Sequence, residues 1–271
     1  MTITSNTYRV FTSRVRSSER RQPVAALTLW MVTWMLAALS VASGQSTGAG
    51  AGDGVATGVV MVDDFEAHDV GTVPGGWSYL HKKKIVPLTE EFMRPRERFT
   101  VVKDGTRQVL RAYSHNEAVH ISLVNGESRL DWDLETHPVL AWEWNARKLP
   151  PGAREDQDQL NDSAAAIYVI FSMDGFLVKR PKTIKYVFSS SLPVGTVVSY
   201  GKLKVIVVSD GSMADAGWIR VERDVAQDYR TVFGDEPPRR PLSIRLWSDS
   251  DNTGAEAEVD FDNIRLIPAS R

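Results

Sequence analysis

The chain has 271 residues, with 32 Lys or Arg against 34 Asp or Glu, so its formal net charge is −2 at neutral pH. It contains no cysteine, which excludes disulfides, thiolate metal sites and a lipid attached at a lipobox cysteine. Stability must therefore come from a hydrophobic core, and a mature chain of roughly 220 residues is long enough for one β-sandwich domain.

The first 44 residues have the order of an export signal: basic, then apolar, then small. Its basic residues are Arg9, Arg14, Arg16, Arg20 and Arg21. An apolar run from Val24 to Ala42 follows, and Ala42-Ser43-Gly44 offers a cleavage site before Gln45. The pattern predicts a signal peptide over residues 1–44 and a periplasmic or secreted protein. The alternative is an anchor retained through residues 24–42, because an apolar run of about 19 residues can span a hydrocarbon core of roughly 30 Å.

The rest of the chain divides into a short linker and one domain. Loss of residues 1–44 would remove five Arg and one Glu and leave a net charge of about −6, so a nucleic-acid partner is not expected. Residues 45–58 are rich in Gly, Ala, Ser and Thr and predict a flexible linker. Residues 59–271 are predicted to form a single β-sandwich domain.

Short runs of Val, Ile, Tyr, Phe and Trp, separated by Gly, Pro, Asn and Asp, continue to the last residues. The predicted strands are Gly58–Phe65, Trp77–Leu80, Phe99–Lys103, Gln108–Tyr113, Val119–Val124, Val139–Ala146, Ala164–Ser172, Thr183–Ser189, Thr196–Tyr200, Lys204–Val208, Trp218–Glu222, Leu242–Asp249 and Ala257–Ile267. This pattern favours an all-β, antiparallel sandwich over a βαβ fold. Asp104-Gly105 predicts a tight hairpin, because this pair tolerates a positive φ.

One short helix is predicted, capped by Asp224 and ended by Gly234, with Val225, Tyr229 and Phe233 on one face. The motifs of a nucleophile elbow, a zinc protease and a phosphate loop are absent from the sequence. The histidines lack ligand spacing and are interpreted as surface or hydrogen-bonded residues; they are His68, His81, His115, His120 and His137. The basic run over residues 82–84 is interpreted as solvated surface.

Four polar groupings remain. The first pairs Asp63-Asp64-Phe65-Glu66 with Asp260-Phe261-Asp262-Asn263. If the first and last strands lie side by side, these carboxylates can converge on a hard cation such as calcium. Otherwise they are edge-strand or turn acids that point to water.

The second grouping is a polar loop with Arg154-Glu155-Asp156 at one end and Asn161-Asp162-Ser163 at the other. Loops of this kind are usually only solvated. This loop nevertheless combines the planar guanidinium of Arg154 with several carboxylates and the amide of Asn161. Such groups can bind the hydroxyls or the carboxylate of a ligand.

The third grouping is Trp142-Glu143-Trp144, whose strand period of two places both tryptophans on one face and Glu143 on the other. A core position is favoured for the tryptophans over a sugar-stacking one. Glu143 then faces solvent or lines a cleft. The same two alternatives apply to Lys185. The fourth grouping, over residues 249–254, lacks the spacing of an EF-hand and is interpreted as a structured turn.

Four long stretches of the sequence are "WEWNARKLPPGAREDQDQLNDSAAAIYVIF", "IKYVFSSSLPVGTVV", "DYRTVFGDEPP" and "LWSDSDNTGAEAEVDFDNIRL". They resemble a bacterial family of unknown function, DUF3047. The resemblance runs from about Val62 to Leu266, and it implies no established activity.

The two ends also resemble the galactose-binding-like jelly rolls of carbohydrate-binding modules, through "VDDFE…GGW" and "VDFDNIRL". The resemblance implies a jelly-roll sandwich and a structural calcium shared by Glu66 and Asp262. Those modules lack a long loop like that of residues 154–163, so a sugar site cannot simply be transferred.

The sequence thus predicts an exported jelly-roll sandwich that binds a glycan or a small polar ligand without covalent chemistry. The predicted binding residues are Glu143, Arg154, Asp156, Asn161, Asp162 and Lys185. The first alternative is a polysaccharide hydrolase or lyase, in which the same acids, with Lys185 or Tyr186, act as acid and base. The second is an envelope structural protein whose apolar face meets a partner chain.

Overall fold

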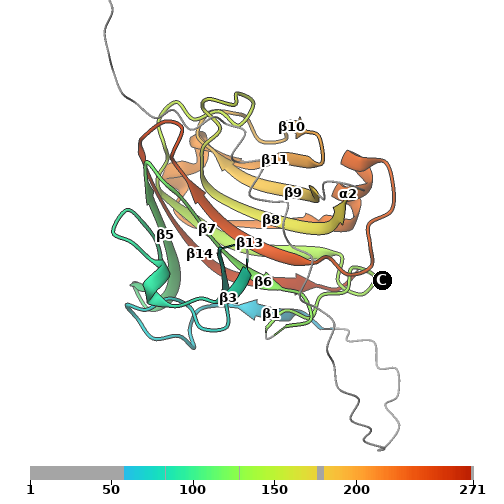
Figure 1. The fold of residues 1–271 in the computed structure, drawn as a ribbon, viewed down its shortest axis with the longest axis horizontal. Helices are drawn as coiled ribbons and strands as arrows, with labels where there is room; N and C mark the ends of the chain where they lie inside the picture. The colour runs from blue at the N-terminus through green and yellow to red at the C-terminus, as the bar shows by residue number, and fades with distance from the viewer. Residues whose placement is uncertain (1–57, 83, 128, 176–179, 270–271) are drawn as a thin grey trace, which may run out of the picture.

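Two β-sheets packed face to face form the fold (Figure 1). The structure is a computed structural model and describes residues 58–269 apart from residues 83, 128 and 176–179. The predicted signal peptide or anchor lies outside the described residues, as does the predicted linker except for Gly58. Within the described part, no helix is both long and apolar enough to span a membrane.

The smaller sheet has six strands in the order β12-β7-β14-β5-β4, with β1 also paired to β14. Its strands are β1 (Val60–Asp63), β4 (Glu97–Asp104), β5 (Arg107–His115), β7 (Val139–Lys148), β12 (Ile219–Asp224) and β14 (Glu256–Ile267). The first and last described strands therefore lie side by side. This was the condition under which the acids of the first polar grouping could converge on a cation.

The larger sheet has eight strands in the order β10-β11-β9-β8-β13-β6-β2-β3. They are β2 (Ser78–His81), β3 (Lys84–Pro87), β6 (Ala118–Val124), β8 (Ser163–Asp174), β9 (Arg180–Ser189), β10 (Val197–Tyr200), β11 (Leu203–Asp210) and β13 (Ser243–Asp249). Among the described residues, the strand pairs in both sheets are antiparallel except for β9 with β11. The predicted all-β jelly-roll sandwich is confirmed.

Every strand predicted from the sequence overlaps an observed strand, but β3 was missed. Its residues, Lys-Ile-Val-Pro, follow two further lysines and contain a proline. Proline cannot donate to a sheet ladder and is confined to edges. β3 indeed lies at the edge of the eight-stranded sheet.

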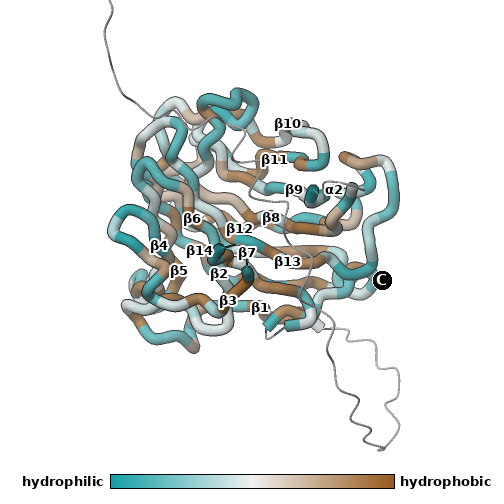
Figure 2. Tube along the Cα trace, viewed as in Figure 1, coloured by the Kyte–Doolittle hydropathy of each residue, from teal (hydrophilic) through white to brown (hydrophobic). Residues whose placement is uncertain are grey.

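The core between the sheets is built by alternation along each strand. On β8 the inward side chains are Ala165, Ile167, Val169 and Phe171. Trp142 and Trp144 on β7 are both fully buried in this core, which confirms the core interpretation of this pair. Figure 2 shows the hydrophobic residues gathered in the strands, whereas the connecting loops are mainly hydrophilic.

The single α-helix, α2 (Val225–Phe233), begins and ends as predicted. The side chain of Asp224 accepts a hydrogen bond from the backbone N–H of Gln227 at 2.8 Å, and Gly234 ends the helix in the left-handed conformation with φ of 78°. Val225 and Tyr229 bury one face of the helix. Two 3-10 turns that the sequence did not predict, η1 (Glu90–Phe92) and η2 (Gly211–Ala216), complete the elements.

Candidate functional site

The outer face of the eight-stranded sheet carries aromatic and charged side chains instead of the usual solvated polar residues. Period-two alternation places these side chains there, since their neighbours in sequence point into the core. They are His120 and Ser122 on β6, Arg245, Trp247 and Asp249 on β13, Tyr168 on β8, and Thr183 and Lys185 on β9.

Three of these rings, Tyr168, Trp247 and His120, form what we call the aromatic row. His120 and Trp247 are paired across β6 and β13, and their rings stack with centroids 4.6 Å apart and an interplanar angle of 8°. The ring of Tyr168 lies 5.2 Å from that of Trp247 at 37°. The row thus runs across three neighbouring strands.

Two cations border the aromatic row. The Lys185 ammonium lies 5.6 Å from the centre of the Tyr168 ring, and the Arg245 guanidinium lies 6.0 Å from that of Trp247. Burial disfavours the charge of Lys185, but nearby Tyr168 and acidic groups outweigh it, so the pKa of Lys185 is raised. Burial lowers the pKa of Arg245 to about 10. Both side chains stay positively charged at neutral pH.

Several buried polar atoms of this face make no hydrogen bond within the described part of the chain. They are Nε2 of His120, Nε1 of Trp247 and Oγ1 of Thr183. Burial, together with the nearby Arg245, lowers the pKa of His120 well below its usual range, so its imidazole is neutral. Native proteins leave few buried polar groups unpaired, and each unpaired group costs about 1–3 kcal/mol.

Three carboxylates meet at the end of this face, where β8 begins and β13 ends. One oxygen of each of Asp162, Asp249 and Asp251 lies within 4.8 Å of the others. Asp162 accepts hydrogen bonds from the backbone N–H groups of Asn252 at 3.0 Å and Thr253 at 2.7 Å. The second and fourth polar groupings of the sequence are therefore joined in space, and three carboxylates are a donor set that could hold a hard cation.

The acids of this cluster repel one another. Burial, with the neighbouring Asp251 carboxylate, raises the pKa of Asp249 well above its usual range, and Lys185 opposes this shift. Burial also raises the pKa of Asp251, with Asp162 adding to the effect. Asp249 is thus a carboxyl group that retains its proton at a higher pH than an exposed aspartate.

The predicted polar loop divides into an exposed and a buried part. Asp156 is exposed and Arg154 is partly exposed, and the two pair with each other at 2.9 Å. Glu155 is fully buried and accepts hydrogen bonds from Ser163 at 3.1 Å and Ser189 at 2.6 Å. Glu155 therefore anchors the loop to the edge of the outer face, although it was not among the predicted binding residues.

Of the predicted binding residues, the structure brings Asp162 and Lys185 to one face, on which Asp249 also lies. Lys185 and Asp162 both act on the pKa of Asp249, which places all three in one electrostatic group. Asn161 precedes Asp162, and its Oδ1 is a buried atom without a hydrogen bond among the described residues. Glu143 lies apart, on β7 of the other sheet, where it pairs with Arg107 at 2.7 Å.

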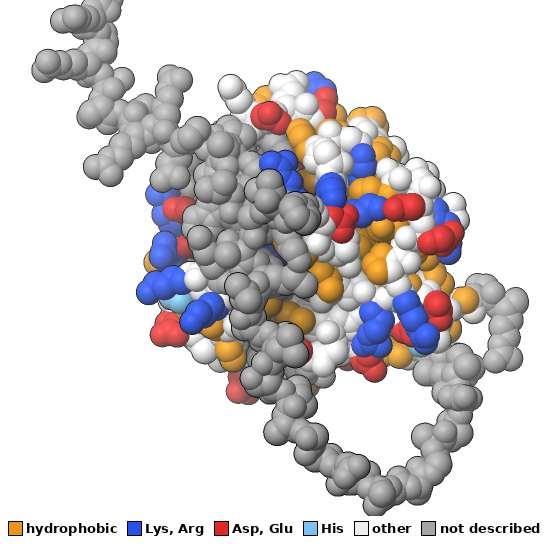
Figure 3. All heavy atoms as spheres, turned by 45° about the vertical axis from the view of Figure 1, so that its right-hand side comes forward, with side chains coloured by type: hydrophobic (Ala, Val, Ile, Leu, Met, Phe, Trp, Pro, Cys, Tyr) orange, Lys and Arg blue, Asp and Glu red, His pale blue; other side chains and the backbone are white. Residues whose placement is uncertain are grey.

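The outer face of the six-stranded sheet, which carries Glu143, is lined by ion pairs. Asp260 accepts hydrogen bonds from Arg111 at 2.7 Å and Arg147 at 2.8 Å, and Lys148 pairs with Glu256. On the side of the molecule shown in Figure 3, basic and acidic side chains also lie next to one another. Charges matched in this way are typical of a solvated surface.

The two residues predicted to share calcium have other partners in the structure. The Glu66 carboxylate accepts the backbone N–H of Gln108 at 2.9 Å, and the Asp262 carboxylate accepts from Nε of Arg107 at 2.7 Å. The buried Asp63 of the same grouping accepts from Nε1 of Trp77 at 2.8 Å. A calcium ion at Glu66 and Asp262 stays a prediction.

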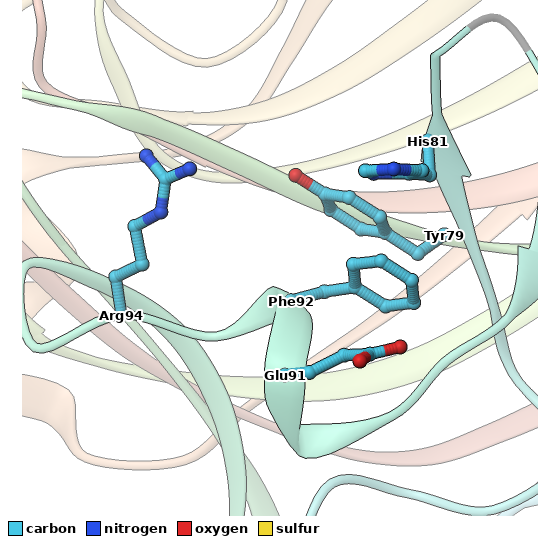
Figure 4. Close-up of a pocket in the computed structure, with 5 residues that line it drawn as sticks. All are labelled: Tyr79, His81, Glu91, Phe92 and Arg94. Carbon is cyan, nitrogen blue, oxygen red and sulfur yellow. The ribbon is translucent and has the colours of Figure 1, made fainter.

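A pocket of about 290 Å³ lies beside β2, next to the edge strand β3 of the eight-stranded sheet. It is lined by Tyr79, His81, Glu91, Phe92 and Arg94. Figure 4 shows the rings of His81, Tyr79 and Phe92 one above another, with Arg94 on the opposite side of the opening. None of these residues was singled out from the sequence as a binding residue.

The sequence did carry a signal for the aromatic row. In the run from Ile244 to Asp249, the apolar residues Ile244 and Leu246 alternate with other residues. This alternation places Arg245, Trp247 and Asp249 together on the opposite face of the strand. The run Val119-His120-Ile121 gives the same signal for His120.

Comparisons with known proteins give a family and several similar folds. The family model described as "Protein of unknown function (DUF3047)" matches residues 86–265, whereas no curated protein matches the chain. A family 11 carbohydrate-binding module of a cellulosomal cellulase from Clostridium thermocellum is 13% identical, with 79% of this chain and 96% of that chain covered and a TM-score of 0.34. A family 30 module from the same organism is 12% identical, with 79% and 99% covered and a TM-score of 0.38. A cyclase from Fischerella sp. TAU is 17% identical, with 78% and 98% covered and a TM-score of 0.32.

Proposed function

The chain belongs to the DUF3047 family, whose model is described only as a protein of unknown function, and we propose that it binds a glycan or another hydroxyl-rich ligand on the outer face of its eight-stranded sheet. The binding is non-covalent. The proposal includes export of the chain to the periplasm or the medium, where such ligands occur.

The observation that carries the proposal is the coincidence of aromatic rings and unpaired polar atoms on one face. Tyr168, Trp247 and His120 supply aromatic rings on this face, where Tyr168 and Trp247 are buried with 5% and 9% of their surface exposed, and Nε1 of Trp247 and Nε2 of His120 are buried without hydrogen bonds among the described residues. Ligand sites combine apolar lining with a few polar groups that fix the orientation of the ligand. A hydroxyl-rich ring uses both, because its C–H groups pack on aromatic carbon and its hydroxyls donate and accept hydrogen bonds.

The charged groups of this face add both hydrogen-bond donors and hydrogen-bond acceptors. The ammonium of Lys185 donates, and the carboxylates of Asp162 and Asp251 accept. The opposite face of the sandwich lacks this arrangement in the described part of the chain, since its carboxylates are mostly bound by arginine and lysine. Glu143, Arg154 and Asp156 are therefore weaker candidates than the sequence suggested, because each is satisfied by an ion pair.

The direct test is binding of the purified protein to an array of glycans that includes neutral glucans, galactans and polyuronates. Trp247→Ala should weaken binding of any glycan that responds by at least roughly tenfold. The matched control is Trp218→Ala, because Trp218 lies on the other sheet, stacked by Arg107 and hydrogen-bonded to Asp104. Equal losses in both variants, or no glycan that binds, would refute the proposal.

A second candidate, hydrolysis or elimination on a polysaccharide, is favoured by one observation. Asp249 has a pKa raised by burial and by Asp251, and it lies beside Asp162 and near the cation Lys185. A carboxyl whose pKa is raised by burial beside a second carboxyl is a group that general acid catalysis can use. A turnover assay on each glycan that binds separates the two functions: product formation that Asp249→Asn abolishes would establish the enzyme, and binding without product would exclude it for that glycan.

A further inference from the structure

The side chains that line the pocket beside β2 reach the surface of the molecule. Tyr79, His81 and Phe92 are partly exposed, and Glu91 and Arg94 are exposed. The volume of about 290 Å³ lies near the lower limit of roughly 300–1,000 Å³ for ligand pockets. The pocket is therefore accessible from solvent and has room for a single ring.

One side of the pocket is an aromatic wall made of Tyr79, His81 and Phe92. Tyr79 and His81 are two positions apart on β2, so their side chains lie on the same face of that strand. The ring of Phe92 stacks on that of Tyr79 with centroids 4.8 Å apart and an interplanar angle of 16°, and it lies 5.1 Å from the His81 ring. Because Tyr79 also packs against the main core, the wall is a fixed surface for the carbon face of a ring ligand.

The Arg94 side chain lies on the opposite side of the opening from this wall (Figure 4). The backbones of Arg94 and Glu97 are held together by two hydrogen bonds, at 2.9 and 3.2 Å. One guanidinium nitrogen of Arg94 lies 3.3 Å from the Glu97 carboxylate, and the Arg94 side chain is 75% exposed. A guanidinium has five N–H donors, and two of them side by side match the two oxygens of a carboxylate. Arg94 thus has donors left for an acidic ligand.

The other polar groups of the pocket suit hydroxyls. The Tyr79 hydroxyl makes no hydrogen bond within the described part of the chain. Burial, together with the nearby Glu97 carboxylate, raises the pKa of Tyr79, so its hydroxyl keeps its proton at neutral pH and can donate it. The exposed Glu91 carboxylate accepts one hydrogen bond, from the Thr89 hydroxyl at 3.2 Å. In Figure 4 Glu91 lies beyond Phe92, away from Arg94, so an acceptor and a cation are held at different sides of the pocket.

The stretch of chain that carries most of the pocket is basic. Residues 82–98 contain six Lys or Arg against three Glu, a local net charge of +3, whereas the whole chain has a net charge of −2. Lys82, Lys84, Arg96 and Arg98 of this stretch are exposed. A local excess of positive charge on an otherwise acidic molecule raises the concentration of anions near the site.

We propose that this pocket binds a sugar acid, with the carboxylate of a single hexuronate ring on Arg94, its carbon face against the aromatic wall, and its hydroxyls on Tyr79 and Glu91. The site is separate from the outer face of the eight-stranded sheet and goes beyond the function proposed above, because none of its lining residues belongs to that face.

The test compares free monosaccharides that differ only at C6, where one carries a carboxylate and the other a hydroxymethyl group. The pairs are glucuronate with glucose and galacturonate with galactose, each titrated against the purified protein and followed by NMR. At least one uronate should bind at least roughly tenfold more tightly than its neutral partner, because charge-assisted hydrogen bonds are stronger than neutral ones. Added salt should weaken the binding of the uronate.

Substitutions of exposed arginines locate the effect without disturbing the core. Arg94→Gln should lower the uronate affinity by roughly tenfold and leave the neutral sugar unchanged. Arg94→Lys keeps the charge but loses the paired donors, so it should recover only part of that loss. The matched control is Arg98→Gln, which removes the same charge four positions along the chain from an exposed residue that does not line the pocket, and it should retain most of the uronate affinity.

The outcomes separate this proposal from the previous one. Equal affinities for uronate and neutral sugar, no uronate binding, or equal losses in Arg94→Gln and Arg98→Gln would refute the uronate site and leave the outer-face proposal standing. Trp247→Ala lies outside the pocket and should leave the binding of the free uronate unchanged. If Arg94→Gln lowers uronate affinity while Trp247→Ala weakens the binding of no glycan, the outer-face proposal is refuted and the uronate site stands.

Discussion

Trp142 and Trp144 lie two positions apart on β7 and are both fully buried, yet they differ in one hydrogen bond. Nε1 of Trp144 donates to Oγ of Ser209 at 3.0 Å. Nε1 of Trp142 is buried without a hydrogen bond among the described residues. A made hydrogen bond contributes about 1 kcal/mol to stability, and an unsatisfied buried N–H costs about 1–3 kcal/mol.

This difference predicts unequal effects of the same substitution. Both Trp142→Phe and Trp144→Phe leave a smaller side chain in the core, but the second also breaks a hydrogen bond and the first removes an unsatisfied donor. Trp144→Phe should therefore lower the free energy of unfolding by at least about 1 kcal/mol more than Trp142→Phe. Urea unfolding measures both values, and an equal or reversed order would contradict the assignment.

Asp249 gives a pH dependence of stability. Because its folded-state pKa is raised from 3.8, its contribution to stability is fully present below the unfolded pKa and is lost as the pH rises through the folded pKa. Asp249→Asn cannot ionise. The free energy of unfolding of the variant, minus that of the unaltered protein, should therefore increase as the pH rises above about 3.8.

Unfolding by urea across the pH range, in the presence of a chelator, checks this expectation. The control is Asp215→Asn, because Asp215 is exposed. A difference that stays constant for Asp249→Asn, or that decreases with pH, would show that the carboxyl is not destabilised by its surroundings.

At the scale of an element, α2 shows how local signals alone can define a helix. It has nine residues, fewer than an isolated helix needs in water. Asp224 pairs with the backbone at its start, Gly234 turns the chain at its end, and Tyr229 packs on Phe171 with ring centroids 4.7 Å apart. The caps set its limits, and the packing supplies most of its stability.

Removal of the cap should therefore have a modest, defined cost. Asp224→Ala loses the hydrogen bond to Gln227 and should lower the free energy of unfolding by about 1 kcal/mol. Asp224→Ser keeps a capping oxygen and should recover most of that loss. Thermal unfolding compares the two variants, and a Ser variant as unstable as the Ala variant would show that the acid acts through its charge and not as a cap.

At the scale of the whole molecule, local patterns predicted the strands, the helix and single residues of the candidate site, but not which of those residues meet. Alternation along single strands was enough to place Trp142 and Trp144 in the core. Asp162 and Asp249 lie 87 positions apart, and they meet only because β8 and β13 pair with Asp249 opposite Ser163. Strand order is a property of the complete sheet, so no local pattern could predict that contact.

Three of the predicted binding residues are charged side chains that have ion-pair partners in the fold. Glu143, Arg154 and Asp156 combine chemistry that suits a ligand, but each finds an ion-pair partner in the fold. A sequence shows which charges exist and not which of them are paired. The pocket residues were missed for a related reason, since Tyr79 and Phe92 come from separate elements that contact one another only after folding.

The position of β14 in the six-stranded sheet also fixes when the molecule can fold. This strand pairs with β1, β5 and β7. Val60 of β1 pairs with Leu266 of β14, which is synthesised about 200 residues later. At a usual synthesis rate of about 5–20 residues per second, that delay is roughly 10–40 s. During this time β1 and one edge each of β5 and β7 have no partner, and exposed strand edges of this kind are open to aggregation. The six-stranded sheet can therefore close only after β14 has been synthesised.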